Sequence, residues 1–143
     1  MSLNVRYYQP EDYEDLITLY HQGHLYGGQF DENRDSREKL SDITSRDPES
    51  IIICTDQSDA VIGTVSLIED GRVAWLFRFA VARTDREAEV SKLLYQKATD
   101  ILKGRGHHQI LVYTDSKDAH LKQRYKDLEM QEGGIYTCFW ADM

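Results

Sequence analysis

The stretch GRVAWLFRFAVARTDREAEVSKLL, residues 71–94, contains a strand followed directly by a helix. Its first half, residues 71–82, is an apolar run rich in valine, phenylalanine and tryptophan, which is typical of a buried strand. Val90 and Leu94 begin a helical spacing that continues to the glycine-bearing KGRG of residues 103–106, which predicts a long amphipathic helix. A strand that leads into a long helix indicates mixed α and β structure.

Two more strands precede this stretch. Residues 50–55 (SIIICT) and 60–69 (AVIGTVSLIE) are apolar runs separated by turn-forming residues. The dipeptide Asp70-Gly71 then joins the second run to residues 71–82, and this pair is a strong hairpin signal. An earlier strand is expected over residues 3–9, which are rich in β-forming side chains. The sequence therefore predicts antiparallel pairing in the middle of the chain.

Three shorter helices accompany the long one. Pro10 favours a helix start, and apolar residues recur at helical spacing after it. A second helix is expected to begin at Asp35, because Asp35 and Glu38 fit a capping box. Helical spacing between Leu121 and Leu128 predicts another near the end of the chain.

The remaining apolar runs complete the predicted order of elements. Residues 107–114 (HHQILVYT) are expected to form a buried strand, and residues 135–140 (IYTCFW) a final one. Helices on either side of residues 107–114 favour partly parallel pairing there. The prediction is an α/β (α+β) fold in which a mixed sheet has helices on both faces. The chain has no linker-like tract, so residues 1–143 are expected to form a single domain.

Composition limits the classes of function. The 143 residues carry a net charge of −8, which argues against nucleic acid as a partner, since such proteins present a basic face. The acidic balance suits an amine-bearing partner. The sequence has no apolar run long enough to cross a membrane and no signal-peptide layout at its start, so a cytoplasmic protein without membrane contact is expected. Cys54 and Cys138 lie in apolar runs and are interpreted as buried hydrophobic residues.

Several of these segments together resemble the GNAT family, the Gcn5-related N-acetyltransferases. The resemblance rests on VRYYQPEDYEDLITLY (5–20), the hairpin into FRFAV (77–81), the long helix and HLKQRYKDLEM (120–130). It implies a splayed sheet that holds acetyl-CoA between the strand ending in FAV and the strand containing ILVYT. It further implies that backbone groups of the first strand hold the pantetheine arm and that the loop opening the long helix wraps the pyrophosphate. By this resemblance the cofactor-binding residues are Phe79, Ala80, Val81, Arg86, Glu87, Ala88, Glu89, Val90 and Ser91.

The pyrophosphate loop departs from the family pattern Arg/Gln-x-x-Gly-x-Gly/Ala. Arg86 matches its first position, but Glu89 replaces the first glycine and Ser91 the second. A carboxylate about 5 Å from a phosphate, at an effective dielectric of roughly 20, costs about 3 kcal/mol. Thr84 and Glu87 also fit a T-x-x-E capping box, which would occupy the free N–H groups of the helix start. Both features predict weakened cofactor binding.

The resemblance assigns further roles near the end of the chain. Tyr125 matches the tyrosine that protonates the departing thiolate, and a phenol with a pKa near 10 still holds its proton at pH 7. His24 and Tyr26 are candidates to bind the acceptor substrate, and Glu69, Asp115 and Asp118 are candidates for a general base. Lys117, Lys122, Arg124 and Lys126 form either a solvated helix face or a phosphate site.

The function that these observations favour is acetyl-CoA-dependent N-acetyl transfer to an amine-bearing small molecule or peptide. The alternative is a catalytically inactive protein of the same fold that binds or regulates a partner. Homodimers are also implied by the resemblance, with the final strand or a sheet edge as the contact. His21 and His24, three residues apart with acidic residues nearby, hint at a metal, but this spacing alone is a weak signal and no metal centre is expected.

Overall fold

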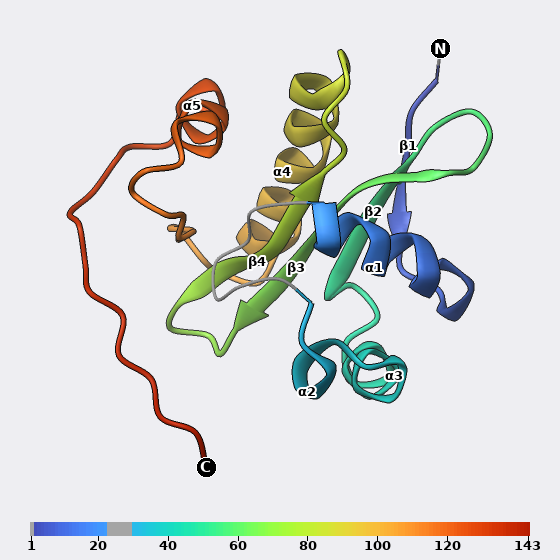
Figure 1. The fold of residues 1–143 in the computed structure, drawn as a ribbon, viewed down its shortest axis with the longest axis horizontal. Helices are drawn as coiled ribbons and strands as arrows, with labels where there is room; N and C mark the ends of the chain where they lie inside the picture. The colour runs from blue at the N-terminus through green and yellow to red at the C-terminus, as the bar shows by residue number, and fades with distance from the viewer. Residues whose placement is uncertain (1, 23–29) are drawn as a thin grey trace.

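The predicted antiparallel hairpin lies in a four-stranded sheet (Figure 1). The computed structural model describes residues 2–22 and 30–143. Within them the strand order follows the chain order, β1-β2-β3-β4, and each strand is antiparallel to the next. The strands are β1 (Asn4–Tyr7), β2 (Ile51–Thr55), β3 (Val61–Glu69) and β4 (Ala74–Val81).

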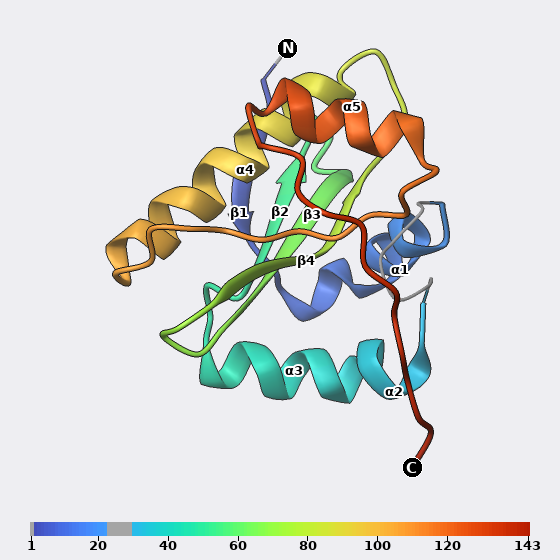
Figure 2. The same cartoon turned by 90° about the vertical axis from the view of Figure 1, so that its left-hand side faces the viewer.

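Helices cover both faces of this sheet, as predicted. A 3₁₀ turn η1 (Pro10–Asp12) leads into α1 (Tyr13–Gln22), which is followed by α2 (Glu32–Asp35), α3 (Arg37–Arg46), α4 (Glu87–Gly104) and α5 (Ala119–Asp127). Figure 2 shows α4 and α3 on opposite sides of the strands. None of the helices in the described segments has the length and apolar character that a membrane span needs.

Each face of the sheet has its own hydrophobic core. Ile52 and Cys54 on β2 pack with the buried side of α4, whereas Ile51 and Ile53 pack with residues of α1 and α3. This division follows from the alternation of side chains along a strand. A strand buried on both faces explains why β2 reads as a continuous apolar run, and the predicted α/β (α+β) fold class is confirmed.

The hairpin between β3 and β4 forms at the predicted dipeptide. The Asp70 carboxylate accepts hydrogen bonds from the backbone N–H groups of Arg72 and Val73, and Gly71 adopts a left-handed conformation with φ of 91°. Glycine is suited to that conformation because it lacks a Cβ. The side chain and backbone of Arg72 both donate to Asp70 and lower its pKa to about 2.

Helix α4 packs closely against the sheet at Gly63. A Cβ placed there would lie 2.6 Å from Cγ1 of Val90 and 2.9 Å from Cδ1 of Leu94. Both distances are shorter than a van der Waals contact between carbon atoms. The absence of a side chain at Gly63 therefore permits the helix to pack directly on β3.

A bulge interrupts the second half of β4. Thr64 pairs with Ala80 and Ser66 pairs with Phe77, so Arg78 and Phe79 together oppose a single residue of β3. Arg78 has a φ of 50°, a left-handed conformation that is uncommon for a residue with a side chain. Its guanidinium is buried and forms an ion pair with Asp35 at 2.7 Å. Bulges re-aim the backbone locally, and this one lies just before the end of β4.

Asp35 does not cap a helix, contrary to the prediction. Helix α3 begins at Arg37, and its N-cap is Ser36, whose hydroxyl accepts a hydrogen bond from the N–H of Lys39 at 3.1 Å. Asp35 is instead fully buried opposite Arg78. The sequence pattern is compatible with either Asp35 or Ser36 as the N-cap of α3. The buried guanidinium of Arg78 requires a negative partner, and the carboxylate of Asp35 is that partner.

The predicted strand over residues 107–114 is reduced to one bridge. Leu111 lies parallel to Trp75, donating to the carbonyl of Ala74 and accepting from the N–H of Leu76, each at 2.9 Å. Figure 2 shows this segment passing alongside β4. The parallel part of the predicted mixed sheet is thus limited to this contact, and the regular ladder is antiparallel throughout.

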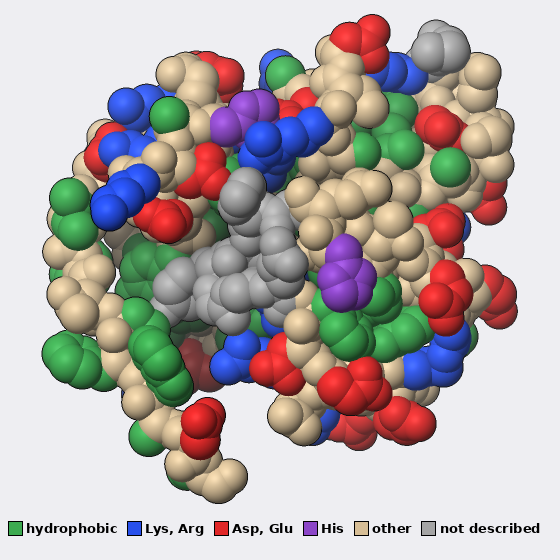
Figure 3. Space-filling model, in the orientation of Figure 1, with side chains coloured by type: hydrophobic (Ala, Val, Ile, Leu, Met, Phe, Trp, Pro, Cys, Tyr) green, Lys and Arg blue, Asp and Glu red, His purple; other side chains and the backbone are tan. Residues whose placement is uncertain are grey.

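The predicted final strand is absent from the described structure. Ile135, Tyr136, Phe139 and Trp140 are exposed, and the segment extends from the body of the protein (Figure 3). Cys138 is therefore exposed, which corrects its interpretation as a buried residue, whereas Cys54 is buried as predicted. A strand requires a partner edge, and this apolar run has none here.

Candidate functional site

A pocket of about 490 Å³ lies between α4 and α5. Glu87, Ala88 and Ser91 line it from the first turns of α4, and His120 and Arg124 line it from α5. The first N–H groups of a helix lack partners within the helix and favour an anion. Three of the predicted cofactor-binding residues therefore meet two potential cations from the other helix.

The start of α4 does not form the predicted capping box. Its N-cap residue is Arg86, with no hydrogen bond from a capping side chain. The hydroxyl of Thr84 accepts instead from the N–H of Arg86 at 3.1 Å, within the turn that precedes the helix. Glu87 is the first residue of the helix, and its carboxylate points to another partner. The side chains of Thr84 and Glu87 therefore do not form the predicted capping box with the free N–H groups at the start of α4.

Glu87 connects α4 to α5. The Nε2 atom of His120 donates to both of its carboxylate oxygens, at 2.6 and 2.9 Å. One of these oxygens also lies 3.7 Å from Nη2 of Arg124. The Glu87 carboxylate therefore lies on the side of the pocket that His120 and Arg124 line from α5.

The other acidic residue of this turn has a different partner. Glu89 accepts from the guanidinium of Arg86 at 3.1 and 3.2 Å, and in this pair Glu89 is exposed whereas Arg86 is partly buried. Val90 is buried in the core beneath α4 and contributes to packing. Of the predicted loop residues, Arg86 and Glu89 therefore pair with each other and do not line the pocket, and Val90 faces the core.

Two buried polar atoms beside the pocket have no hydrogen-bond partner among the described residues. They are the hydroxyl Oγ of Ser91 and the Nε of Arg124, and the two residues are 1% and 7% exposed. A buried donor without a partner costs free energy, so such atoms call for an explanation. A polar ligand in the pocket would supply the missing acceptor.

Arg124 also reaches the end of β4. Its Nη1 donates to the carbonyl of Phe79 at 3.4 Å, and its guanidinium lies 5.7 Å from the centre of the Phe79 ring. In sequence Arg124 lies among exposed lysines, which favoured a solvated face for the whole group. Its spacing of three residues from the buried Leu121 is the signal that could have identified it as inward-facing.

The predicted catalytic residue lies against the same strand end. The ring of Tyr125 is 6.1 Å from that of Phe79, and both belong to the core cluster beneath α4. Burial raises the pKa of the Tyr125 phenol, an effect partly offset by the adjacent charge of Arg124. Phe79, Ala80 and Val81 are themselves buried. The structure therefore brings Tyr125 to the end of β4, with its phenol protonated at neutral pH.

A larger gap of about 1450 Å³ opens on the other side of α5. It lies between residues 107–116 and the C-terminal segment, and Tyr125 lines it as well. The predicted acceptor-binding residues His24 and Tyr26 lie outside the described residues. Within the described segments, no group of three His, Cys, Asp or Glu side chains is arranged to hold a metal ion.

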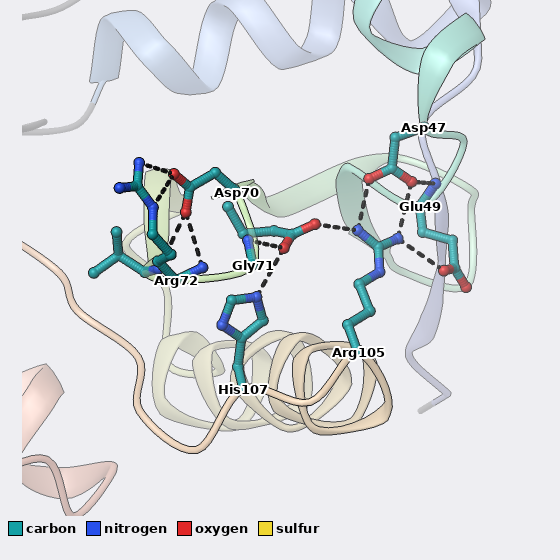
Figure 4. Close-up of polar contacts among 9 residues, drawn as sticks. Asp47, Glu49, Asp70, Gly71, Arg72, Arg105 and His107 are labelled. Carbon is teal, nitrogen blue, oxygen red and sulfur yellow. Dashed lines mark hydrogen bonds and ion pairs between the residues drawn. The ribbon is translucent and has the colours of Figure 1, made fainter.

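The general-base candidates already have partners. Glu69 accepts from His107 at 2.7 Å and from Arg105 at 3.2 Å, and Arg105 also binds Asp47 and Glu49 (Figure 4). Glu69 pairs with the first residue of β4 and is thus at the opposite end of that strand from Phe79. The hydrogen bond from His107 lowers the pKa of Glu69, with a smaller contribution from Arg105. This cluster connects α4 to the sheet and stabilises the fold.

The other two candidates stabilise local structure. Asp115 accepts from the N–H of Lys117 at 2.8 Å in a turn. Asp118 is the N-cap of α5 and accepts from the N–H of Leu121 at 3.0 Å. Each of these carboxylates therefore has a structural hydrogen bond in the turn before α5 or at its N-cap.

Comparison with protein families agrees with this arrangement. The sequence profile of the acetyltransferase (GNAT) family matches residues 11–129, which extends from the N-terminal turn to the end of α5. The chain belongs to the GNAT family. Among proteins of curated function, none matches this GNAT chain in sequence.

Solved structures share the fold of this GNAT chain at low sequence identity. The PaiA N-acetyltransferase of Thermoplasma acidophilum, in complex with coenzyme A, is 22% identical with a TM-score of 0.71, and the match covers 88% of this chain and 87% of that one. Glucosamine-6-phosphate N-acetyltransferase of Arabidopsis thaliana is 16% identical with a TM-score of 0.73, covering 99% of this chain and 100% of that one. An N-acetyltransferase of Staphylococcus aureus is 14% identical with a TM-score of 0.73, covering 94% and 86%.

Proposed function

We propose that this GNAT chain transfers an acetyl group from acetyl-CoA to an amine. The observation that supports this most directly is the pocket at the start of α4, where the Oγ of Ser91 and the Nε of Arg124 are buried without partners. Both atoms can donate hydrogen bonds, and an anionic or amide-bearing ligand would accept them. The residues present therefore fit the binding of coenzyme A.

We infer how the chain would hold this ligand. The first turn of α4, from Arg86 to Ser91, would receive the pyrophosphate, and Arg124 would provide a positive charge from α5. The backbone of Phe79, Ala80 and Val81 would hold the pantetheine arm beside β4. Acetyl-CoA, when bound, supplies an activated acetyl thioester.

Tyr125 is the proposed acid. Its phenol holds a proton at neutral pH because its ordinary pKa is near 10, burial raises that pKa further, and its ring packs against Phe79. From this position its hydroxyl would donate a proton to a departing thiolate, as general-acid catalysis requires. Backbone N–H groups near Ala80 and Val81 would stabilise the developing oxyanion.

The cofactor loop is proposed to bind weakly. Glu89 stands at a position where the family pattern has glycine, and Glu87 lines the pocket itself. Each adds a negative charge near the proposed pyrophosphate position. The inactive alternative was suggested by a self-capped helix start, and that capping box does not form.

The acceptor is proposed to be an amine on a small molecule or peptide. His24 and Tyr26 remain the proposed acceptor-binding residues, and the net charge of −8 would attract a cationic amine. The proposed location is the cytoplasm. A homodimer is the proposed oligomer, because five large hydrophobic side chains of the C-terminal segment are exposed.

Coenzyme A binding tests this proposal. The melting temperature should rise with millimolar CoA, because a ligand at about 100 times its Kd adds about 2.7 kcal/mol of stability. Thiol release from acetyl-CoA should then increase when primary amines are added. A protein that shows neither a thermal shift nor calorimetric heat with CoA is not an acetyltransferase of this kind.

A further inference from the structure

The anion-binding side of the α4–α5 pocket already contains a carboxylate. Glu87 accepts two hydrogen bonds from the imidazole of His120 and lies 3.7 Å from the guanidinium of Arg124, so it engages both side chains that α5 directs to this side. Its side chain is only 15% exposed, which shows that it is folded into the interface between the helices. The arrangement places a negative charge of the protein beside the start of a helix.

We propose that Glu87 is an internal anion that competes with the phosphate groups of the ligand for Arg124 and His120, and so sets the affinity of the pocket. This inference rests on the proposed function and specifies what controls ligand binding at that site. In the protein without ligand, the Glu87 carboxylate accepts the hydrogen bonds of His120 and lies opposite the positive charge of Arg124. When a phosphate enters, it takes over His120 and Arg124, and the Glu87 side chain turns outward to water.

The buried unpartnered atoms support this competition. The carboxylate of Glu87 reaches Nη2 of Arg124, but the Nε of Arg124 and the Oγ of Ser91 remain without acceptors. A carboxylate has two oxygens, and both are engaged by His120. A phosphate has more acceptor oxygens than a carboxylate and can satisfy Arg124 on more than one nitrogen. Glu87 is therefore an incomplete substitute for the anion that this pocket can bind.

Glu89 does not have this role, although it stands at the expected glycine position. Its carboxylate binds Arg86 on the same helix, and its side chain is 56% exposed. At that exposure water screens its charge, and the side chain can move without loss of a buried contact. The structure thus separates the two acidic residues, one competing within the pocket and one on the rim.

The test compares charge-neutral variants by calorimetric titration with two probes, CoA and inorganic pyrophosphate. Glu87→Gln keeps the shape and a hydrogen bond to His120 but removes the negative charge. We expect it to bind both probes about tenfold more tightly than the unaltered protein, which corresponds to about 1.4 kcal/mol. Asp85→Asn is the matched control, because it removes one negative charge from an exposed residue at the same junction. Its affinity should remain within about twofold, as expected for a screened surface charge.

A second comparison identifies the group for which Glu87 competes. The gain from Glu87→Gln should disappear in a protein that also carries Arg124→Gln, since the cation released by the first change is then missing. Circular dichroism of every variant checks that the fold is retained.

The results separate the two proposals. CoA binding to the unaltered protein without tighter binding by Glu87→Gln would overturn the competition while leaving the acetyltransferase proposal in place. Equal gains in Glu87→Gln and Asp85→Asn would also overturn it, because they would indicate a general charge effect. If neither the unaltered protein nor Glu87→Gln binds either probe, both proposals fail.

Discussion

The guanidinium of Arg78 donates to both carboxylate oxygens of Asp35, at 3.2 and 2.7 Å, and both side chains are buried. Removal of one partner would leave the other charge in the core without compensation, a loss that costs about 3–5 kcal/mol. We therefore expect Asp35→Leu or Arg78→Met to lower the free energy of unfolding by that amount, measured by urea denaturation.

The double variant Asp35→Leu with Arg78→Met provides the control. A buried ion pair replaced by apolar side chains of similar size is often tolerated. The double variant should be more stable than either single variant. Destabilisation equal to the sum of the two single effects would show that the pair is not coupled.

The cluster around Arg105 makes stability depend on pH. Hydrogen bonds from Arg105 hold the pKa values of Asp47 and Glu49 below their usual range. Carboxylates with lowered pKa values stabilise the folded state above their unfolded pKa of about 4, and this contribution is lost as pH falls through the folded pKa. The free energy of unfolding should therefore fall below about pH 4. Arg105→Gln should make that decrease shallower in urea titrations at several pH values.

A second arginine tests the specificity of this effect. Arg46 pairs with Asp42 on α3, but both side chains are exposed. Arg46→Gln removes the same charge and should leave the pH dependence as it is, because exposed pairs contribute little. Identical pH slopes for Arg105→Gln and the unaltered protein would contradict the assignment of the acid sensitivity to this cluster.

Helix α4 limits the size of the residue at position 63. The Cβ of Gly63→Ala would overlap Val90, a stiff β-branched side chain, at 2.6 Å. Overpacking of this kind costs about 1–3 kcal/mol, so the melting temperature should fall. Adding Val90→Ala should restore part of the loss, making the double variant more stable than the sum of the single effects. Strict additivity would mean that the two positions do not contact each other.

Tyr125 should affect catalysis more than binding. Tyr125→Phe retains the ring on Phe79 but removes the proton donor, so kcat should fall about 10²-fold while the Kd for CoA stays within about twofold. Thiol release from acetyl-CoA with a panel of primary amines measures the rate. Tyr113→Phe is the control, because Tyr113 stacks on Trp75 at 4.7 Å and its ring is retained. Equal losses in both variants would argue against a specific role for Tyr125.

The C-terminal segment is expected to determine the oligomer. Phe139 and Trp140 are 89% and 82% exposed, and apolar surface of this kind favours association. Sedimentation should give twice the chain mass of 16.6 kDa, and Phe139→Ser with Trp140→Ser should shift the protein to the monomer. Gln131→Ala, at the start of the same segment, should remain dimeric. A monomeric unaltered protein would rule out the homodimer.

Periodicity and turn chemistry predicted most of the fold because those signals are local. The hairpin at Asp70 and the amphipathic face of α4 depend on neighbouring residues alone. The apolar run at residues 135–140 was wrongly assigned to a strand, because strand formation depends on a partner edge that the run itself does not specify. The capping interpretation of Asp35 failed for a related reason, since its partner Arg78 lies far away in sequence.

The candidate site was predicted in part. The order of strand and helix indicated the junction at Arg86–Ser91, and the resemblance to the family indicated Tyr125. The hydrogen bonds between His120 and Glu87, which form in place of the expected capping box, could not be predicted, because His120 reaches the junction only through the packing of α5 on α4. Arg124 was named only as a member of the basic cluster, and its burial could not be predicted because it depends on the same packing.

The identity of strand order and chain order has a consequence for how the protein folds. Each strand pairs with the strand before it, so most of the sheet assembles from contacts of short sequence separation, and such topologies fold quickly. The β3–β4 hairpin is the natural nucleus, and α4 follows it directly in the chain. Helix α5 docks through a longer connection, so we expect the ligand pocket to be the last region to assemble and the first to open during native-state hydrogen exchange.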